Sequence, residues 1–148
     1  MLVSFESDSN ETKWGQLTIH AAQPSTTRRS WPLWVFRGAV TLSAILLFNQ
    51  AIFAGEFLSG SYPALAFHRE FASVAGVSVM LTLVAAILLR SVGRMAWWPI
   101  VSQAALVGCI VLQIIAGYQG LLFVHVPLGV ATILAMTLVT AWAWRVKP

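Results

Sequence analysis

The chain has 148 residues, of which 58% are hydrophobic and only 9% are charged, and its formal net charge is +4. A soluble domain carries roughly a quarter of charged residues, so this composition excludes a water-soluble globular protein and predicts that lipid surrounds most of the chain. The basic residues flank apolar segments instead of forming a stripe, which argues against nucleic acid as a partner. The single cysteine, Cys109, excludes an internal disulfide and a cysteine-based metal site.

Residues 1–36 form a polar segment that precedes the first apolar stretch. The segment has no apolar h-region, so it is not a secretory signal peptide. Its low hydrophobicity and its many Ser, Thr and Asn residues predict a flexible cytoplasmic tail, which either stays solvated or folds on a partner. The basic stretch between Pro24 and Pro32 is also suited to lie on anionic lipid headgroups.

Four apolar stretches follow the tail, at about 39–57, 71–89, 98–118 and 122–144. Each is close to the ~20 residues that a helix needs to cross the hydrocarbon core. Lipid cannot satisfy backbone hydrogen bonds, so spans of this length must be helices. Short connections make consecutive helices antiparallel neighbours. Residues 37–148 are therefore predicted to form an all-α integral membrane domain, an up-down four-helix bundle.

The lysines and arginines predict how this bundle is oriented. Basic residues lie before the first span, in the second connection and after the fourth span: Lys13, Arg28, Arg29, Arg37, Arg90, Arg94, Arg145 and Lys147. Only Arg69 falls on the other side. The positive-inside rule then predicts a multi-pass protein of the inner (plasma) membrane with both termini cytoplasmic. Six tryptophans map to the same cytoplasmic interface, where amphipathic rings collect: Trp31, Trp34, Trp97, Trp98, Trp142 and Trp144.

Two of the three histidines are candidate metal ligands. His68 and His125 are predicted at the outer starts of the second and fourth helices, at similar depth in the membrane. Histidine in or near a bilayer is costly and marks a candidate functional site. His20 lies in the tail and carries no spacing signal.

The sequences that precede these histidines match each other. The first span contains Gln50-Ala-Ile-Phe-Ala-Gly55, and the third contains Gln113-Ile-Ile-Ala-Gly117. In both, a loop follows and a histidine opens the next helix. The match predicts a tandem repeat of helical hairpins, a common construction in membrane folds.

A porphyrin explains this pattern. Two neutral imidazoles from opposite helices fit the axial positions of one haem iron, and small residues are needed where helices face the macrocycle. The candidate small residues are Gly55, Ala72, Gly76, Gly117 and Gly129. Arg69, adjacent to one ligand, is the candidate partner of the anionic propionates. The alternative is that both histidines cap helix starts and that the small residues only serve helix packing.

The segment His68-Arg69 followed by Ala72 resembles the His-Arg-x-x-Ala segment of the haem A synthase family. The stretch Leu112–Gly117 with His125 and Gly129 is also similar to it. That family is built from two four-helix halves, so the resemblance implies that residues 37–145 correspond to one half and that both histidines are axial ligands. Short four-helix bacterial membrane proteins with paired histidines share the pattern. Leu65 stands where the synthase has a glutamate, and the outer cysteine pair is absent, which argues against oxidation of a haem methyl group.

The sequence is thus interpreted as a haem b protein with bis-histidine ligation. Its expected role is electron transfer, either as a small cytochrome or as a subunit of a respiratory or photosynthetic complex, and an enzymatic role is the less favoured interpretation. The first alternative is a cofactor-free accessory subunit of a larger membrane complex. The second is a haem-modifying enzyme related to haem A synthase.

Overall fold

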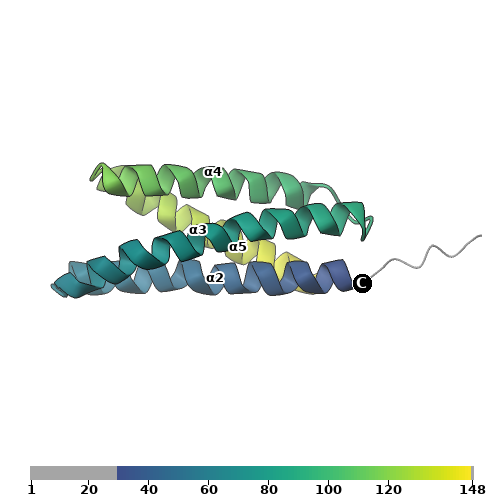
Figure 1. Cartoon of the computed structure of the whole chain (residues 1–148), viewed down its shortest axis with the longest axis horizontal. Coiled ribbons are helices and arrows are strands. Elements are labelled where there is room, and N and C mark those ends of the chain that lie inside the picture. The colour runs from purple at the N-terminus through teal and green to yellow at the C-terminus, as the bar shows by residue number, and fades with distance from the viewer. Residues whose placement is uncertain (1–29, 148) are drawn as a thin grey trace, which may run out of the picture.

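The computed structural model describes residues 30–147 of the chain (Figure 1). The described residues form four helices and no strand: α2 (Trp31–Leu58), α3 (Tyr62–Ser91), α4 (Trp98–Tyr118) and α5 (Leu122–Arg145). All four are long and apolar enough to cross a membrane. The predicted all-helical membrane class is therefore confirmed at this level. Most of the predicted tail, including His20, lies outside the described residues.

The first two helices begin earlier than their apolar stretches predicted. Helix α2 begins at Trp31 instead of residue 39, within the segment assigned to the tail, and α3 begins at Tyr62 instead of residue 71. Both have proline in the first turn, where its fixed φ favours helix and its missing N–H costs nothing. Hydropathy detects only the part of a helix that is apolar enough for the hydrocarbon layer, and these two helices are longer than that part. As a result, His68 lies in the second turn of α3 and not at its start.

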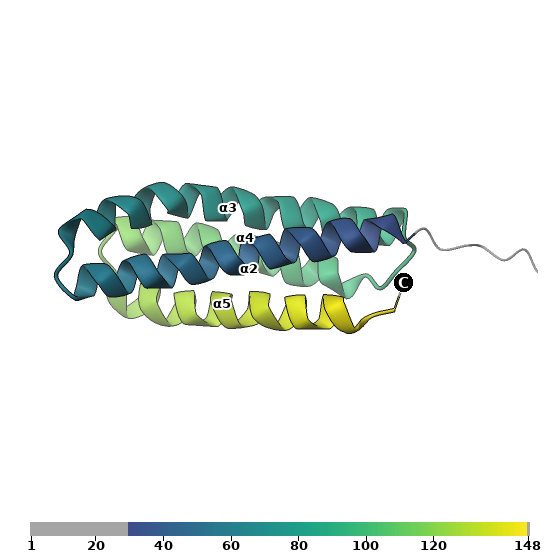
Figure 2. The same cartoon turned by 90° about the horizontal axis from the view of Figure 1, so that it is seen from below.

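The helices form a ring in which each packs against two others. Helix α2 contacts α3 and α5, and α4 contacts the same two helices, whereas the described helices make no close backbone contact across either diagonal. All four run along one long axis (Figure 2). In Figure 1, α3 lies beside α2 at one end and beside α4 at the other, and α5 crosses in the opposite sense. The hairpins α2–α3 and α4–α5 therefore diverge toward their turns.

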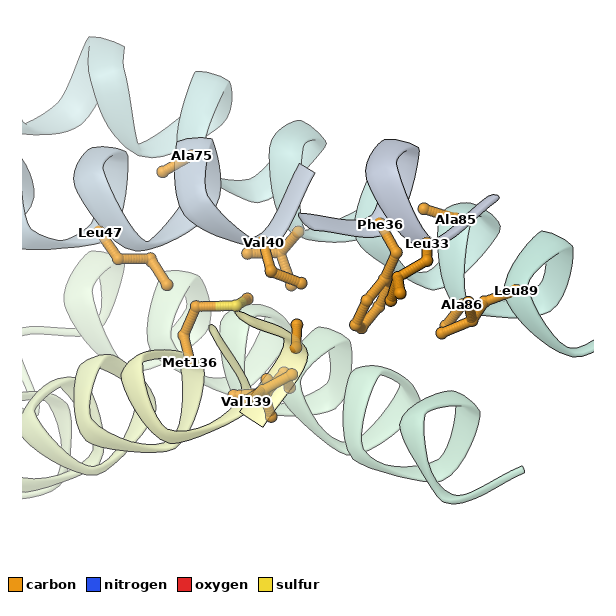
Figure 3. Close-up of a cluster of buried hydrophobic side chains, with 13 residues drawn as sticks. Leu33, Phe36, Val40, Leu47, Ala75, Ala85, Ala86, Leu89, Met136 and Val139 are labelled. Atoms are coloured by element: carbon orange, nitrogen blue, oxygen red, sulfur yellow. The ribbon is translucent and has the colours of Figure 1, made fainter. Parts of the chain in front are cut away.

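The hydrophobic core lies toward the end of the bundle where α2 and α4 begin, which we call the core end. Phe36, Val40 and Leu89 are completely buried there, together with Met136 of α5 (Figure 3). The outward faces are apolar as well, with Ile45 and Leu134 about 60% exposed. A helix that is apolar all round is expected in lipid.

Arg37 ties the first described helix to the last one at the core end. Its Nε donates to the carbonyl of Ala143 at 2.9 Å, and its Nη2 donates to that of Val146 at 2.6 Å. The guanidinium also lies over the rings of Trp34 and Trp144. Carbonyls at a helix C-terminus lack intrahelical partners and carry negative partial charge. They therefore compensate this buried cation, which is only 5% exposed.

All six tryptophans of the predicted interfacial belt lie at the core end, in the first turns of α2 and α4 and the last turn of α5. Trp98 and Trp142 pack edge to face with ring centroids 4.4 Å apart, and Trp34 and Trp144 do so at 6.0 Å. The belt therefore also links the first and last helices.

Candidate functional site: a histidine pair across the bundle

The turns that close the two hairpins are built alike. Each contains a glycine with positive φ, Gly60 at 101° and Gly120 at 70°. The N–H of the next residue, Ser61 or Leu121, donates to a carbonyl five residues earlier, at 3.0 and 2.9 Å. Glycine adopts this left-handed conformation without a Cβ clash. The shared turn supports the hairpin repeat expected from the sequence.

The first hairpin is one helical turn longer than the second. Gln50 lies ten residues before Gly60 and Gln113 seven before Gly120, while His68 lies eight residues after its glycine and His125 five. The difference is three residues on each arm, close to one turn of about 3.6 residues. Figure 2 shows the α2–α3 hairpin projecting beyond the other. His68 and His125 thus reach the same depth although they lie at different distances from their helix starts.

Each histidine is anchored to the preceding helix of its own hairpin. Nδ1 of His68 lies 3.1 Å from the backbone carbonyl of Gln50, and Nδ1 of His125 lies 2.9 Å from that of Gln113. A carbonyl oxygen only accepts, so Nδ1 must carry the proton in both rings, and Nε2 of the neutral imidazole keeps its lone pair. Metal-binding histidines use this arrangement, in which the second nitrogen is held by a carbonyl.

The two rings meet across the α3–α5 diagonal. Their centroids are 6.0 Å apart, and their planes are inclined by 73°. A metal–imidazole bond is about 2.0–2.1 Å long and the nitrogen lies roughly 1 Å from the ring centre, so two imidazoles on opposite sides of one metal place their centroids about 6 Å apart. The observed separation is close to this value and also lies within the ordinary range of edge-to-face ring contacts, about 4.5–7 Å. The end of the bundle that contains this pair and the two hairpin turns is called the histidine end.

Two of the predicted small residues lie next to this arrangement. A Cβ added at Gly117 would lie 3.1 Å from Cε1 and 3.2 Å from Nδ1 of His125. A Cβ at Gly129 would lie 2.6 Å from Nε2 of Gln113. Gly117 therefore lets the imidazole lie against α4, and Gly129 lets the amide of Gln113 lie against α5.

The other predicted site residues are placed differently. Gly55 is exposed, and a Cβ there would meet nothing within 4 Å. Gly76 packs against Ile110 of α4. Ala72 is half-buried one turn beyond His68, and the side chain of Arg69 is exposed. Neither Gly55 nor Gly76 thus approaches a histidine ring.

The protein atoms of this site suit an axial ligand pair better than a complete metal cage. Among residues 30–147, no group of three or more His, Cys, Asp or Glu side chains could hold a metal ion. Haem iron takes four nitrogens from its porphyrin and needs only two axial ligands. Two imidazoles with free Nε2 atoms are such a donor set.

Sequence reasoning missed the role of the two glutamines. Their backbone carbonyls hold the histidines. Within the described part of the chain, both amide atoms of Gln50 and Oε1 of Gln113 are buried without a partner. The repeated Gln in the two matching stretches was the signal that marked them.

No protein-family model, no curated protein and no solved structure matches this chain. The resemblance to the haem A synthase family therefore rests on the motif residues alone.

Proposed function

We propose that this protein binds one haem b through His68 and His125 and carries single electrons within a membrane. The observation that carries the proposal is the histidine pair, anchored through Nδ1 on both sides and separated by 6.0 Å between centroids. In this proposal, the Nε2 atoms of both rings bind one iron, and the Nδ1–carbonyl contacts leave these atoms without a proton. Histidines that only capped helix starts would not need to face each other across a diagonal.

The remaining residues of the site have supporting roles in this proposal. Gly117 keeps the His125 ring in its orientation, and Ala72 and Gly129 limit side-chain bulk one turn beyond each ligand. The exposed guanidinium of Arg69 neutralises propionates at the membrane surface. Haem, when bound, supplies a one-electron couple whose potential depends on axial ligands and burial.

We further propose an up-down bundle that spans the plasma membrane with its core end and both termini on the cytoplasmic side. The support is the distribution of charge and of tryptophan over the described helices. One basic residue, Arg69, lies at the histidine end, and the others lie at the core end together with the tryptophan belt: Arg37, Arg90, Arg94, Arg145 and Lys147. The polar segment before Trp31 is then available to dock on a larger respiratory or photosynthetic complex.

Difference spectroscopy of the purified protein tests the haem assignment. The wild type, expressed with ample haem supply, should show the Soret and α bands of low-spin haem b. His68→Ala and His125→Ala should each abolish these bands, because bis-histidine ligation needs both nitrogens. His20→Ala, in the tail, should leave the spectrum unchanged. A wild type without haem bands would contradict the proposal and favour the cofactor-free accessory subunit.

Cysteine labelling in intact cells tests the orientation independently of haem. On a Cys109→Ser background, a cysteine at Ser61 in the α2–α3 turn should react with an impermeant maleimide. A cysteine at Ser91, at the other end of α3, should not. Both positions are exposed, so access to the residue does not limit either reaction. The reverse pattern would invert the proposed topology.

A further inference from the structure

Two buried glutamine amides lie beside the histidine pair without hydrogen-bond partners. Among the described residues, nothing pairs with Nε2 or Oε1 of Gln50 or with Oε1 of Gln113. A buried polar group without a partner carries the full cost of its desolvation. Lipid provides no partner, so in a membrane helix such groups require a protein group or internal water.

Both amides lie on the core side of the histidines. Side chains on a helix incline toward its N-terminus, and α2 and α4 both run from the core end to the histidine end. The amide of Gln113 accordingly reaches Gly129, one turn beyond His125. At this level α5 and α3 carry the small residues Gly129 and Ala72, and the amide of Gln113 lies against Gly129.

The two sides of this level differ in their burial. Toward the core end, Leu47 is 5% exposed and Met136 is completely buried, and both belong to the continuous apolar core. Toward the histidine end, the two imidazoles themselves are only half-buried. The glutamines thus lie between the most deeply buried part of the bundle and the half-buried histidine pair.

We infer that Gln50 and Gln113 form an internal hydration site, in which ordered water supplied from the histidine end bridges the two amides. A buried water makes on average about three hydrogen bonds, and two amides from α2 and α4 offer donors and acceptors for this purpose. The site does not depend on the haem assignment.

Thiol accessibility tests the site. On a Cys109→Ala background, Gln50→Cys and Gln113→Cys should react with a small impermeant cationic thiosulfonate applied on the side that labels Ser61→Cys. Leu47→Cys, one turn deeper on α2, and Met136→Cys should stay unlabelled. Failure of both glutamine positions to react, in protein that is folded by size-exclusion chromatography, would overturn the inference, as would equal labelling at Leu47→Cys and Met136→Cys.

A second measurement detects water beside the two amides in the wild-type protein, without any cysteine substitution. In bilayers with ¹⁵N-glutamine label, magnetisation from water should transfer to the side-chain amide nitrogens of Gln50 and Gln113. The two signals are assigned by their loss in Gln50→Leu and Gln113→Leu. Absence of transfer to both amides would show that they are dry, whatever the result of haem spectroscopy.

Discussion

At the core end, α2, α3 and α5 meet mainly through buried apolar side chains, whereas at the histidine end polar anchors join the two helices of each hairpin, α2 to α3 and α4 to α5. Phe36, Leu89 and Met136 are completely buried. Beyond Leu47 and Ala75, the buried residues of the described helices are only Ala64 and Ala116. The rings of His68 and His125 occupy the space between the hairpins instead. The comparison indicates that one end supplies most of the stability and leaves the other free to bind a ligand.

Phe36→Ala tests whether the core end supplies most of the stability, and it should have the largest effect of the substitutions considered. The ring is completely buried and packs edge to face with Trp142. Truncation of a buried Phe costs about 3–5 kcal/mol through lost contacts and the cavity left behind. Unfolding in detergent should show this loss. Phe48→Ala, on the same helix but 61% exposed to lipid, is the matched control and should cost far less. Equal losses would show that no dominant core exists.

Arg37→Met tests a second stabilising feature of the core end, the link between Arg37 and the end of α5. The substitution keeps the apolar stem but removes the two bonds to the carbonyls of Ala143 and Val146. Hydrogen bonds to a charged group are worth roughly 1.5–3 kcal/mol, so the last turn of α5 should fray. Amide hydrogen exchange there should accelerate, while the histidine end stays protected as before. Arg90→Met, which loses one exposed bond to Met95, should change little. Unaltered exchange at the end of α5 would argue that the tryptophan belt alone joins the helices.

Gly117→Ala tests how tightly the histidine end defines its ligands. The added Cβ would lie 3.1 Å from Cε1 of His125 while a carbonyl holds Nδ1, so the ring must turn or shift. Overpacking costs typically 1–3 kcal/mol. If both imidazoles bind one haem iron at the observed angle of 73°, two iron d orbitals are nearly degenerate and the ferric low-spin EPR signal should be strongly anisotropic. Gly117→Ala should alter that signal. Gly108→Ala, on the same helix with nothing within 4 Å of its Cβ, should not. A signal that is identical in both variants would mean that Gly117 does not set the ring plane.

The two ends also differ in how far the sequence could predict them. The length of the apolar stretches located all four helices and the bounds of α4, but it misplaced the starts of α2 and α3. For α3 the reason is that the segment before the apolar stretch is also helical: the chain turns at Gly60, and Pro63 lies in the first turn of the helix. The pairing of His68 with His125 was expected from matched contexts. The extra helical turn in the first hairpin was not expected. Each of its two helices is three residues longer between the turn glycine and the matching Gln or His, and a comparison of short motifs does not show this.

Charges and small residues proved harder to place than the helices. Arg37 was counted only as a positive charge before the first span, whereas its guanidinium is buried against the end of α5. Gly55 was selected by its resemblance to Gly117. When the two stretches are aligned on Gln50 and Gln113, however, the position equivalent to Gly117 is Ala54, and Gly55 is exposed. Such details depend on which face of a helix is turned inward, and helices that are apolar all round carry little signal for it.

Arg69→Gln should have the smallest effect, and it probes the outer rim of the histidine end. The guanidinium is exposed and next to His68 in sequence. If haem binds as proposed, removal of a nearby positive charge disfavours its reduced form, so the midpoint potential should fall. A screened surface charge contributes about 0–1 kcal/mol, which corresponds to a decrease of at most roughly 40 mV for one electron. The decrease should shrink as salt is added, since the Debye length shortens from about 10 Å at 0.1 M to 3 Å at 1 M. Arg90→Gln, at the other end of the same helix, should leave the potential unchanged. A rise in potential, or an equal shift in both variants, would contradict a propionate partner at Arg69.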